Sequence, residues 1–321
     1  MKTIEELKDF YSKELEPELV LLEDQRKKVL RNLLITAAVT AVIVFGGVAA
    51  IVFGGGTTPG LGIIVFPVVI TFVICSFALK FFSKSYVADF KNTVINRIIK
   101  FIDPQLHFEP YACIPSHVYD ASDIFQTRYD EYKGEDLVEG TVGKTPMSFS
   151  ELHTEYITRH KNRKQHHTIF RGLFFVAEFN KHFEGKTLVL PDTAQKLFGR
   201  LGQRLQSMNF TRDELVKLED PEFERHFAVH STDQIEARYI LSTSLMKRIT
   251  DFKQRTGREI FISFRFESIF VAIKYNKNLF EPKIFTTLLN FAPIREYYED
   301  LAMAIGIVED LNLNTRIWSK R

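Results

Sequence analysis

The 47 residues from Leu33 to Leu79 contain no lysine, arginine, aspartate or glutamate. A glycine-rich run, residues 54–60, divides this stretch into two apolar segments, 33–53 and 61–79. A helix needs about 20 apolar residues to cross a hydrocarbon core of roughly 30 Å, and a charge buried there is costly. The sequence therefore predicts a transmembrane helical hairpin over 33–79. The alternative, a hairpin in the core of a soluble protein, is disfavoured because charge-free segments of this length are rare there.

Basic residues flank this hairpin on both sides, whereas residues 54–60 carry no charge. The positive-inside rule therefore places both termini and the C-terminal region in the cytoplasm, on an inner (plasma) membrane. Residues 1–24 lack the basic-then-apolar pattern of a cleavable signal peptide, so we expect the first span to be retained. The flanking residues are Arg26, Lys27, Lys28 and Arg31 before the hairpin and Lys80, Lys84, Lys91, Arg97 and Lys100 after it.

Apolar residues recur at three- and four-residue intervals on either side of the hairpin, which is the spacing of an amphipathic helix. We predict an amphipathic cytoplasmic helix over 1–32, with a kink at Pro17 or a new helix that has Pro17 in its first turn, and a cytoplasmic stem helix over 80–104. The two stripes favour a coiled-coil-like stem within one chain. Pairing with a second copy, as a homo-oligomer, or with another helical protein is the alternative. The stripes consist of Ile4, Leu7, Tyr11, Leu15, Leu19, Leu22 and Val29, and of Val87, Phe90, Val94, Ile98, Phe101 and Ile102.

Residues 105–321 are predicted to form a soluble α+β domain on a mostly antiparallel sheet, because strand-like runs joined by short turns precede most of the helix-like segments. We expect one hairpin from 137–144 and 147–158, and a second from 168–179 and 187–190. Three later strands are expected at 227–230, 260–266 and 269–275. The predicted helices are 193–206, 232–241, 243–255 and 296–308.

The charge of residues 103–321 is nearly balanced, since 30 lysines and arginines face 31 aspartates and glutamates, a net charge of 30 − 31 = −1. A nucleic-acid surface needs a concentrated basic face, so we expect no nucleic-acid partner. The predicted partners are the lipid bilayer and a membrane or cytoplasmic protein. Cys75 lies in the second apolar segment and Cys113 in the domain, so no disulfide is expected.

Sequence motifs for catalysis are absent. There is no GxSxG, no GxxxxGK[ST] and no GxGxxG before a helix. Seven of the nine histidines lie between positions 153 and 230, but without HExxH or Cys-His spacing, so we interpret them as surface or core residues. We therefore predict no catalytic residue, no cofactor and no metal site.

The most basic run of the domain, residues 158–167, is expected at the tip between two strands. Arg159, Lys161, Arg163 and Lys164 would there contact anionic lipid headgroups or an acidic partner, because the domain is tethered near a negatively charged leaflet. A solvated loop is the favoured alternative.

Asp233, Glu236 and Arg238 form the second polar group. Glu236 follows Asp233 by three residues, which is the capping-box spacing at the start of a helix. We favour capping together with a buried Arg238–carboxylate pair over the alternative of a ligand site.

Several segments resemble a bacterial family known as domain of unknown function 3137. They are the two-span N-terminus, 129–136 (YDEYKGED), 170–175 (FRGLFF) with Lys181 and 185–187 (GKT), 227–241 (FAVHSTDQIEARYIL), and 270–273 with 280–282. The resemblance extends over nearly the whole chain and implies a bacterial inner-membrane protein. It brings no activity, cofactor or catalytic residue.

The sequence thus favours a non-enzymatic, membrane-anchored cytoplasmic binding, scaffold or sensor module, in which the hairpin anchors and the domain binds a protein or a small ligand. A membrane-bound enzyme with an unrecognised active site in the α+β domain is the alternative. An enclosed pocket lined by polar groups would favour the enzyme, and an exposed apolar groove would favour a protein partner.

Overall fold

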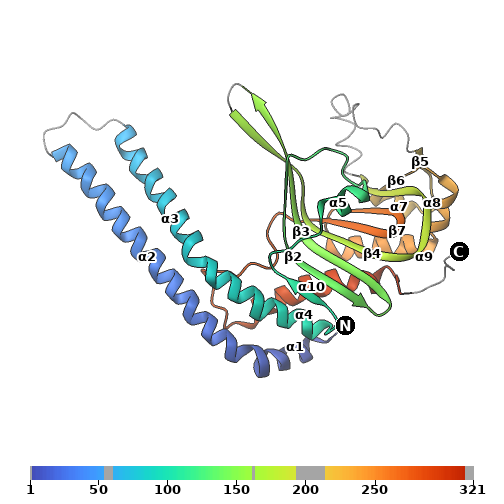
Figure 1. The fold of residues 1–321 in the computed structure, drawn as a ribbon, viewed down its shortest axis with the longest axis horizontal. Coiled ribbons are helices and arrows are strands. Elements are labelled where there is room, and N and C mark those ends of the chain that lie inside the picture. The colour runs from blue at the N-terminus through green and yellow to red at the C-terminus, as the bar shows by residue number, and fades with distance from the viewer. Residues whose placement is uncertain (1, 54–60, 161–162, 193–213, 315–321) are drawn as a thin grey trace. The chain divides into compact units, whose positions relative to one another are not determined.

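The computed structural model describes residues 2–53, 61–160, 163–192 and 214–314. The chain divides into two compact units. The helical unit comprises Lys2–Ile98 and Phe280–Tyr298, and the sheet unit comprises Ile99–Leu279 and Glu299–Arg321. Figure 1 labels their helices and strands. The segment 280–298, which lies within the region predicted as the soluble domain, groups with the helices.

Two long apolar helices form most of the helical unit. Their ends at Phe53 and Leu61 agree with the predicted spans 33–53 and 61–79. Both helices are long and apolar enough to cross a membrane. In the most apolar 18-residue stretch of each helix, only 6% and 0% of the residues are buried. A core helix of a soluble protein would be mostly buried, so this exposure supports membrane anchoring. The helical elements are α1 (Ile4–Phe10), η1 (Tyr11–Leu15), α2 (Glu16–Phe53), α3 (Leu61–Phe90), η2 (Lys91–Ile95) and α4 (Asn96–Ile102).

Pro17 lies in the first turn of α2, as predicted, because the π-helical segment η1 ends at Leu15 and α2 begins at Glu16. A proline lacks the N–H that an α-helix interior would use, and a π-helical turn is one of the places where a helix absorbs such an interruption. Thr3 starts α1 with a capping box, in which its hydroxyl accepts from Glu6 N and the Glu6 carboxylate accepts from Thr3 N.

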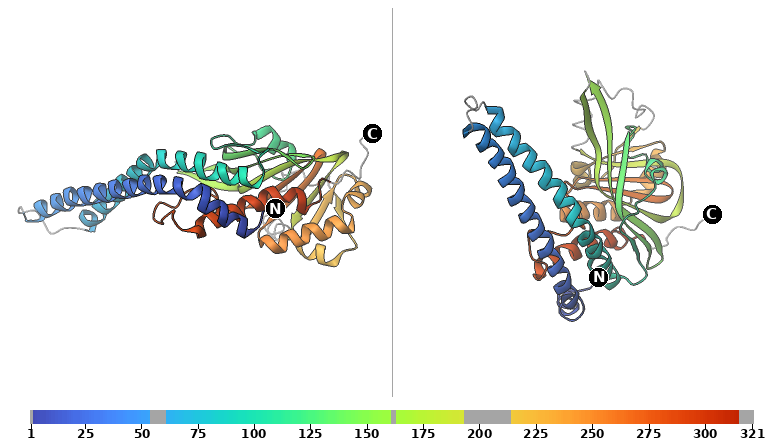
Figure 2. Two further views of the ribbon diagram at one scale, coloured as in Figure 1. Left: turned by 90° about the horizontal axis from the view of Figure 1, so that it is seen from below. Right: turned by 60° about the vertical axis from the view of Figure 1, so that its left-hand side comes forward.

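Most residues of the two predicted apolar stripes are buried within the helical unit. Leu7, Leu15 and Leu19 of the first arm and Phe90 and Val94 of the second are all fully buried. Figure 2 shows α2 and α3 side by side, and an ion pair joins Arg97 to Glu18.

The segment 280–298 is held to both arms by buried charges. Arg26 pairs with Glu23 at 2.7 Å, and the two side chains are 9% and 4% exposed. Arg26 Nη1 also donates to Ile284 O at 2.7 Å, while Leu288 N donates to Glu23 Oε2 at 3.1 Å. On the second arm, the buried Lys91 ammonium pairs with Glu281 at 2.8 Å.

An antiparallel sheet forms the centre of the sheet unit, which confirms the α+β fold class. Its seven strands run in the order β1-β2-β3-β4-β6-β5, and β7 also pairs with β4. The strands are β1 (His107–Glu109), β2 (Glu131–Val142), β3 (Thr145–His160), β4 (Arg163–Pro191), β5 (Glu214–Val216), β6 (Phe227–Ser231) and β7 (Ile260–Lys274).

The predicted 137–144/147–158 hairpin is confirmed as β2 and β3, but the 168–179/187–190 hairpin is wrong. Both of its halves belong to the single long strand β4, whose pairing with β7 shifts register between Glu178 and Lys186. The two strands predicted at 260–266 and 269–275 are likewise one strand, β7, with Phe266 in a left-handed conformation at φ 57°. A register shift within a strand and a turn between two strands look alike in a sequence, because both interrupt the alternation of apolar and polar residues.

The helices of the sheet unit lie mostly where predicted. They include α8 (Gln234–Ile240) and α9 (Thr243–Thr256), and α9 ends at the left-handed Gly257. The predicted helix at 296–308 is longer, α10 (Phe291–Asp310), and only its part from Glu299 onward belongs to the sheet unit; the helix predicted at 193–206 lies outside the described residues. Two short helices, α5 (Ser116–Ser122) and α7 (Pro221–His226), lack a long apolar period and were not predicted. A buried cluster that includes Tyr119 of α5, Leu152, Phe170 and Phe174 covers one face of the sheet.

Candidate functional site

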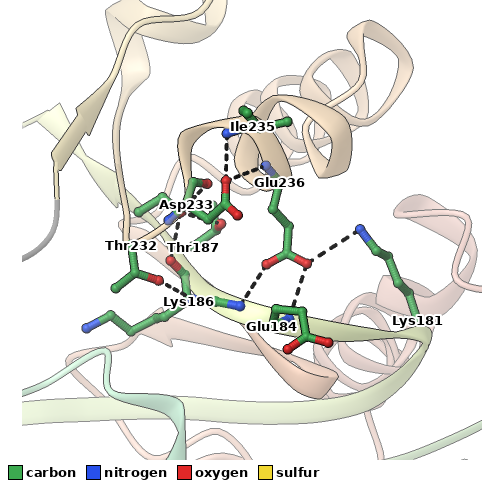
Figure 3. Close-up of polar contacts among 10 residues, drawn as sticks. Lys181, Glu184, Lys186, Thr187, Thr232, Asp233, Ile235 and Glu236 are labelled. Atoms are coloured by element: carbon green, nitrogen blue, oxygen red, sulfur yellow. Dashed lines mark hydrogen bonds and ion pairs between the residues drawn. The ribbon is translucent and has the colours of Figure 1, made fainter.

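The predicted polar group around Asp233 forms a corner between β6 and α8 (Figure 3). One carboxylate oxygen of Asp233 accepts from Ile235 N at 2.8 Å and from Glu236 N at 3.0 Å, so Asp233 is the N-cap of α8. Asp233 N donates to the Ser231 hydroxyl at 3.1 Å, however, and not to Glu236. The helix is therefore capped as predicted, but the return bond of a capping box is replaced.

The Glu236 carboxylate reaches across to the irregular part of β4. It accepts from Gly185 N at 2.9 Å and Glu184 N at 3.3 Å, and Lys181 Nζ lies 3.7 Å away. Thr232 Oγ1 accepts from Lys186 N at 2.9 Å in the same way. Two backbone N–H groups that the register shift removes from the β-ladder are thus paired by one side chain, which makes this corner structural.

Arg238 takes no part in that network. It is exposed, and it donates to Lys217 O at 3.5 Å and to Gln234 Oε1 at 3.3 Å. Within the described residues no carboxylate pairs with it, so the predicted buried Arg238–carboxylate pair is wrong. The reason is that Arg238 falls on the outer side of the short helix α8, away from Ala237 and Ile240, which are buried.

The basic run 158–167 lies at the end of the β3–β4 hairpin, as predicted, and Figure 1 shows these two strands projecting beyond the others. Arg159 is paired in register with Lys164, and His160 with Arg163. These basic side chains are exposed, and Lys161 lies outside the described residues. The strands continue further toward the tip than expected, so the basic residues belong to strand ends rather than to a loop.

A second polar region, which no sequence motif indicated, lies on the face of β2–β4 opposite the buried aromatic cluster. Lys133, His153 and Arg171 form one row across the three strands, because Lys133 lies opposite His153 and His153 lies opposite Arg171. Leu152 and Phe170 belong to the buried cluster, so residues one position away point to the other side of the sheet. We call this region the polar face; it comprises Glu131, Lys133 and Glu135 of β2, Glu151, His153 and Glu155 of β3, and His166, Thr168 and Arg171 of β4.

A cleft of about 430 Å³ opens on the polar face. The backbone below it is crowded: a Cβ on Gly172, which has φ 153°, would lie 2.0 Å from Ile273 O, and a Cβ on Gly134 would lie 2.6 Å from Leu152 Cδ2. Glycine is therefore required at both positions. The lining residues are Tyr111, Lys133, Gly134, Glu135, Glu151, Leu152, His153, Arg171, Gly172, Lys277 and Asn278.

The loop after β7 forms one wall of the cleft. Glu151, which is 8% exposed, accepts from Leu279 N at 2.7 Å and so fixes this loop against β3. Asn278 then receives a hydrogen bond from Arg171 Nη2 at 2.8 Å and donates to Glu135 Oε1 at 3.3 Å. These contacts position the guanidinium of Arg171 and use one of its five N–H donors.

Electrostatics differ along the polar face. Burial lowers the pKa of His153 despite the nearby Glu155, which favours the neutral imidazole. Lys133 lies 2.5 Å from Glu131, and this contact lowers the pKa of Glu131 and raises that of Lys133. Burial raises the pKa of Cys113, which disfavours a reactive thiolate.

Three groups at the far end of the face lie close enough to share a cation: Glu131, Glu155 and His166, whose nearest donor atoms are all within 4.8 Å of one another. His166 Nδ1 lies 3.5 Å from Glu155 Oε2 and 4.0 Å from Glu131 Oε1. The sequence could not reveal this set because its members come from three strands and are separated by 24 and 11 residues.

The chain is thus a protein with an apolar helical hairpin and an α+β domain on an antiparallel sheet. Residues 168–313 match the family model described as "Protein of unknown function (DUF3137)", which supports the family predicted from the sequence. The match runs from β4 to the end of α10 and includes Arg171 and the Asp233–Glu236 corner, but not the helical hairpin or β1–β3. No curated protein sequence matches the chain.

One solved structure is similar, that of the mycobacterial trehalose monomycolate transport factor A, TtfA. The sequences are 10% identical, and the match covers 65% of this chain and 94% of that one with a TM-score of 0.29. A TM-score this low carries no argument about fold or function.

Proposed function

We propose that this protein is a membrane-anchored sensor or binding module whose α+β domain binds a small anionic ligand in the cleft on the polar face. The observation that carries the proposal is the row of Lys133, His153 and Arg171 across three paired strands at that cleft. Lys133 and Arg171 of this row are cations, and Lys277 adds another from the loop after β7. The domain lies in the cytoplasm in this proposal, because the basic residues flank both ends of the hairpin.

The arrangement suits an anion for three reasons. An arginine presents a planar fork that matches a carboxylate or a phosphate group, and Arg171 is held in place by Asn278. Both acids that line the cleft are already hydrogen-bonded within the protein, Glu151 to Leu279 N and Glu135 to Asn278. The volume of about 430 Å³ lies in the range of small-molecule sites.

The test uses the full-length protein in lipid nanodiscs and a thermal-unfolding screen of small anions: inorganic phosphate, sulfate, citrate and nucleotides. We expect at least one anion to raise the unfolding temperature of the wild type and of Arg238→Gln, which removes an exposed arginine of the same domain. The same anion should leave Arg171→Gln unchanged. If no anion stabilises the wild type, or if Arg171→Gln responds equally, the anion-binding proposal is wrong.

A further inference from the structure

We propose that Glu131, Glu155 and His166 bind a divalent transition-metal ion, with Zn²⁺ as the best fit. This inference concerns the end of the polar face nearest the β3–β4 tip. It does not rest on anion binding in the cleft, because none of the three ligands lines that cleft.

The distances between donor atoms fit a metal centre. Zn²⁺ holds imidazole nitrogen at about 2.0–2.1 Å and carboxylate oxygen at about 2.0–2.2 Å in a tetrahedron, so its ligand atoms lie roughly 3.3–3.5 Å apart. His166 Nδ1 is 3.5 Å from Glu155 Oε2 and 4.0 Å from Glu131 Oε1. All three donor atoms lie within 4.8 Å of one another, so side-chain rotations that close the remaining gaps would complete three ligand positions.

The backbone holds these ligands on three neighbouring strands. Glu131 and Glu155 are direct partners in the register of β2 and β3. The pairing of β3 with β4 shifts register between Thr154 and Glu155. Beyond this shift, His166 of β4 lies opposite Ile157 of β3, two residues from Glu155. Two carboxylates placed directly opposite each other repel, and a bound cation would turn that repulsion into attraction.

Neighbouring groups orient both carboxylates. His153 Nε2 lies 3.4 Å from Glu155 Oε1, which leaves Oε2 of Glu155 toward His166. Lys133 Nζ contacts Oε2 of Glu131 at 2.5 Å, whereas Oε1 of that carboxylate faces His166. Contacts of this kind, made to the atom that does not bind the metal, commonly position the ligands of metal sites.

The donor set also selects the kind of metal. An imidazole with two carboxylates suits Zn²⁺, Mn²⁺ or Fe²⁺, whereas Mg²⁺ and Ca²⁺ prefer oxygen ligands alone. The His166 side chain is 42% exposed, so water can complete the coordination.

The test measures Zn²⁺ binding to the full-length protein, prepared without a histidine tag and held in nanodiscs, by equilibrium dialysis with elemental analysis. The variants are His166→Ala and Glu155→Gln, and the matched control is His167→Ala. His167 is the adjacent residue on the opposite side of β4, where it stacks on Tyr156 with ring centroids 4.7 Å apart and contacts the Thr158 hydroxyl at 2.8 Å. Circular dichroism checks that each variant is folded.

We expect one Zn²⁺ per chain in the wild type and in His167→Ala, and an affinity at least tenfold lower in both ligand variants. Cobalt substitution gives a second readout, since Co²⁺ bound at this site should show visible absorption bands that His166→Ala abolishes. Absence of stoichiometric Zn²⁺ binding to the wild type overturns the proposal. Equal affinity in folded His166→Ala and His167→Ala also overturns it, because the binding would then come from other surface histidines.

Discussion

The Asp233–Glu236 corner and the polar face of β2–β4 are both rich in charged side chains, but these side chains have different hydrogen-bonding partners in the two regions. At the corner, the carboxylates accept hydrogen bonds from backbone N–H groups of the same chain. On the polar face, charged side chains of three strands gather around a cleft and pair mainly with other side chains. A polar group that pairs with the backbone stabilises the fold, whereas side chains that converge on a cleft are available to a ligand.

This comparison gives an ordered set of expectations. Substitutions of buried or backbone-pairing polar groups should lower stability without changing ligand binding. Substitutions on the polar face should change binding with little effect on stability. The five predictions below run from the largest expected loss of stability to the smallest.

The Glu23–Arg26 pair is buried, and its two side chains pair with each other. Glu23→Gln leaves Arg26 without its carboxylate partner, and breaking a buried pair in this way costs about 3–5 kcal/mol. We expect the segment 280–298, which this pair holds through Ile284 and Leu288, to become more sensitive to proteolysis in nanodiscs, and the unfolding temperature to fall. The exposed Glu14→Gln is the control, and an equal effect of both variants would contradict the prediction.

The same carboxylate predicts how stability depends on pH. The hydrogen bonds from Arg26 lower the pKa of Glu23 to about 2, whereas a glutamate in the unfolded chain has a pKa of about 4.3. A lowered pKa means that the stabilisation is present above about pH 4.3 and is lost as the pH falls toward 2, in total on the order of 3 kcal/mol. Unfolding measured from pH 6 to 2 should therefore be less pH-dependent in Glu23→Gln than in the wild type.

Gly172 tests the backbone beneath the polar face. An alanine Cβ there would lie 2.0 Å from Ile273 O, so β4 and β7 must separate, at a cost of about 3 kcal/mol. Gly257→Ala is a matched control because it also has positive φ, at 64°, but has nothing within 4 Å of the added atom. It should cost only about 1 kcal/mol. Equal unfolding temperatures for the two variants would show that crowding at Gly172 is relieved elsewhere.

Glu236→Gln tests the corner. The amide still offers one acceptor oxygen, but the two charge-assisted bonds from Glu184 N and Gly185 N cannot both be kept. We expect a loss of about 1–2 kcal/mol in unfolding free energy and no change in anion or Zn²⁺ binding. Glu184→Gln alters an exposed carboxyl in the same irregular part of β4 and should be neutral. A change in ligand binding by Glu236→Gln would instead make the corner part of a site.

Arg171→Gln should give the smallest change in stability, below about 0.5 kcal/mol, since it removes one side-chain hydrogen bond to the exposed Asn278. The same substitution should abolish anion binding in the cleft. Thermal unfolding with and without the anion that stabilises the wild type measures both quantities in one experiment. If Arg171→Gln strongly lowered the unfolding temperature in the absence of ligand, Arg171 would serve mainly to stabilise the fold, and the prediction would be wrong.

The predictable features were those encoded by neighbouring residues. The two apolar helices, the stripes around Leu15 and Phe90, the cap at Asp233 and the stop at Gly257 each depend on residues within a few turns or positions, and all were predicted correctly. The bends of β4 and β7 were misread as turns because a local irregularity does not reveal that pairing continues beyond it. Arg238 was misplaced because burial of a helix face depends on what packs there.

The polar face was missed for a related reason. Its rows join residues that are about 20 positions apart, such as Lys133, His153 and Arg171, and only the register of the strands brings them together. The single local signal was Gly134 and Gly172, each beside a charged residue. A glycine within a strand marks close backbone approach, but it does not identify the strand that comes close.

The segment 280–298 also has a consequence for the order of synthesis. The ribosome finishes the two apolar helices and Ile98 first, and it must add 280 − 98 = 182 residues before Phe280 appears. At roughly 5–20 residues per second, that interval is about 10–40 s. During this time the nascent chain carries Lys91 without Glu281, and Glu23 without the backbone of Leu288. The helical unit is therefore the first part of the protein to be started and one of the last to be completed.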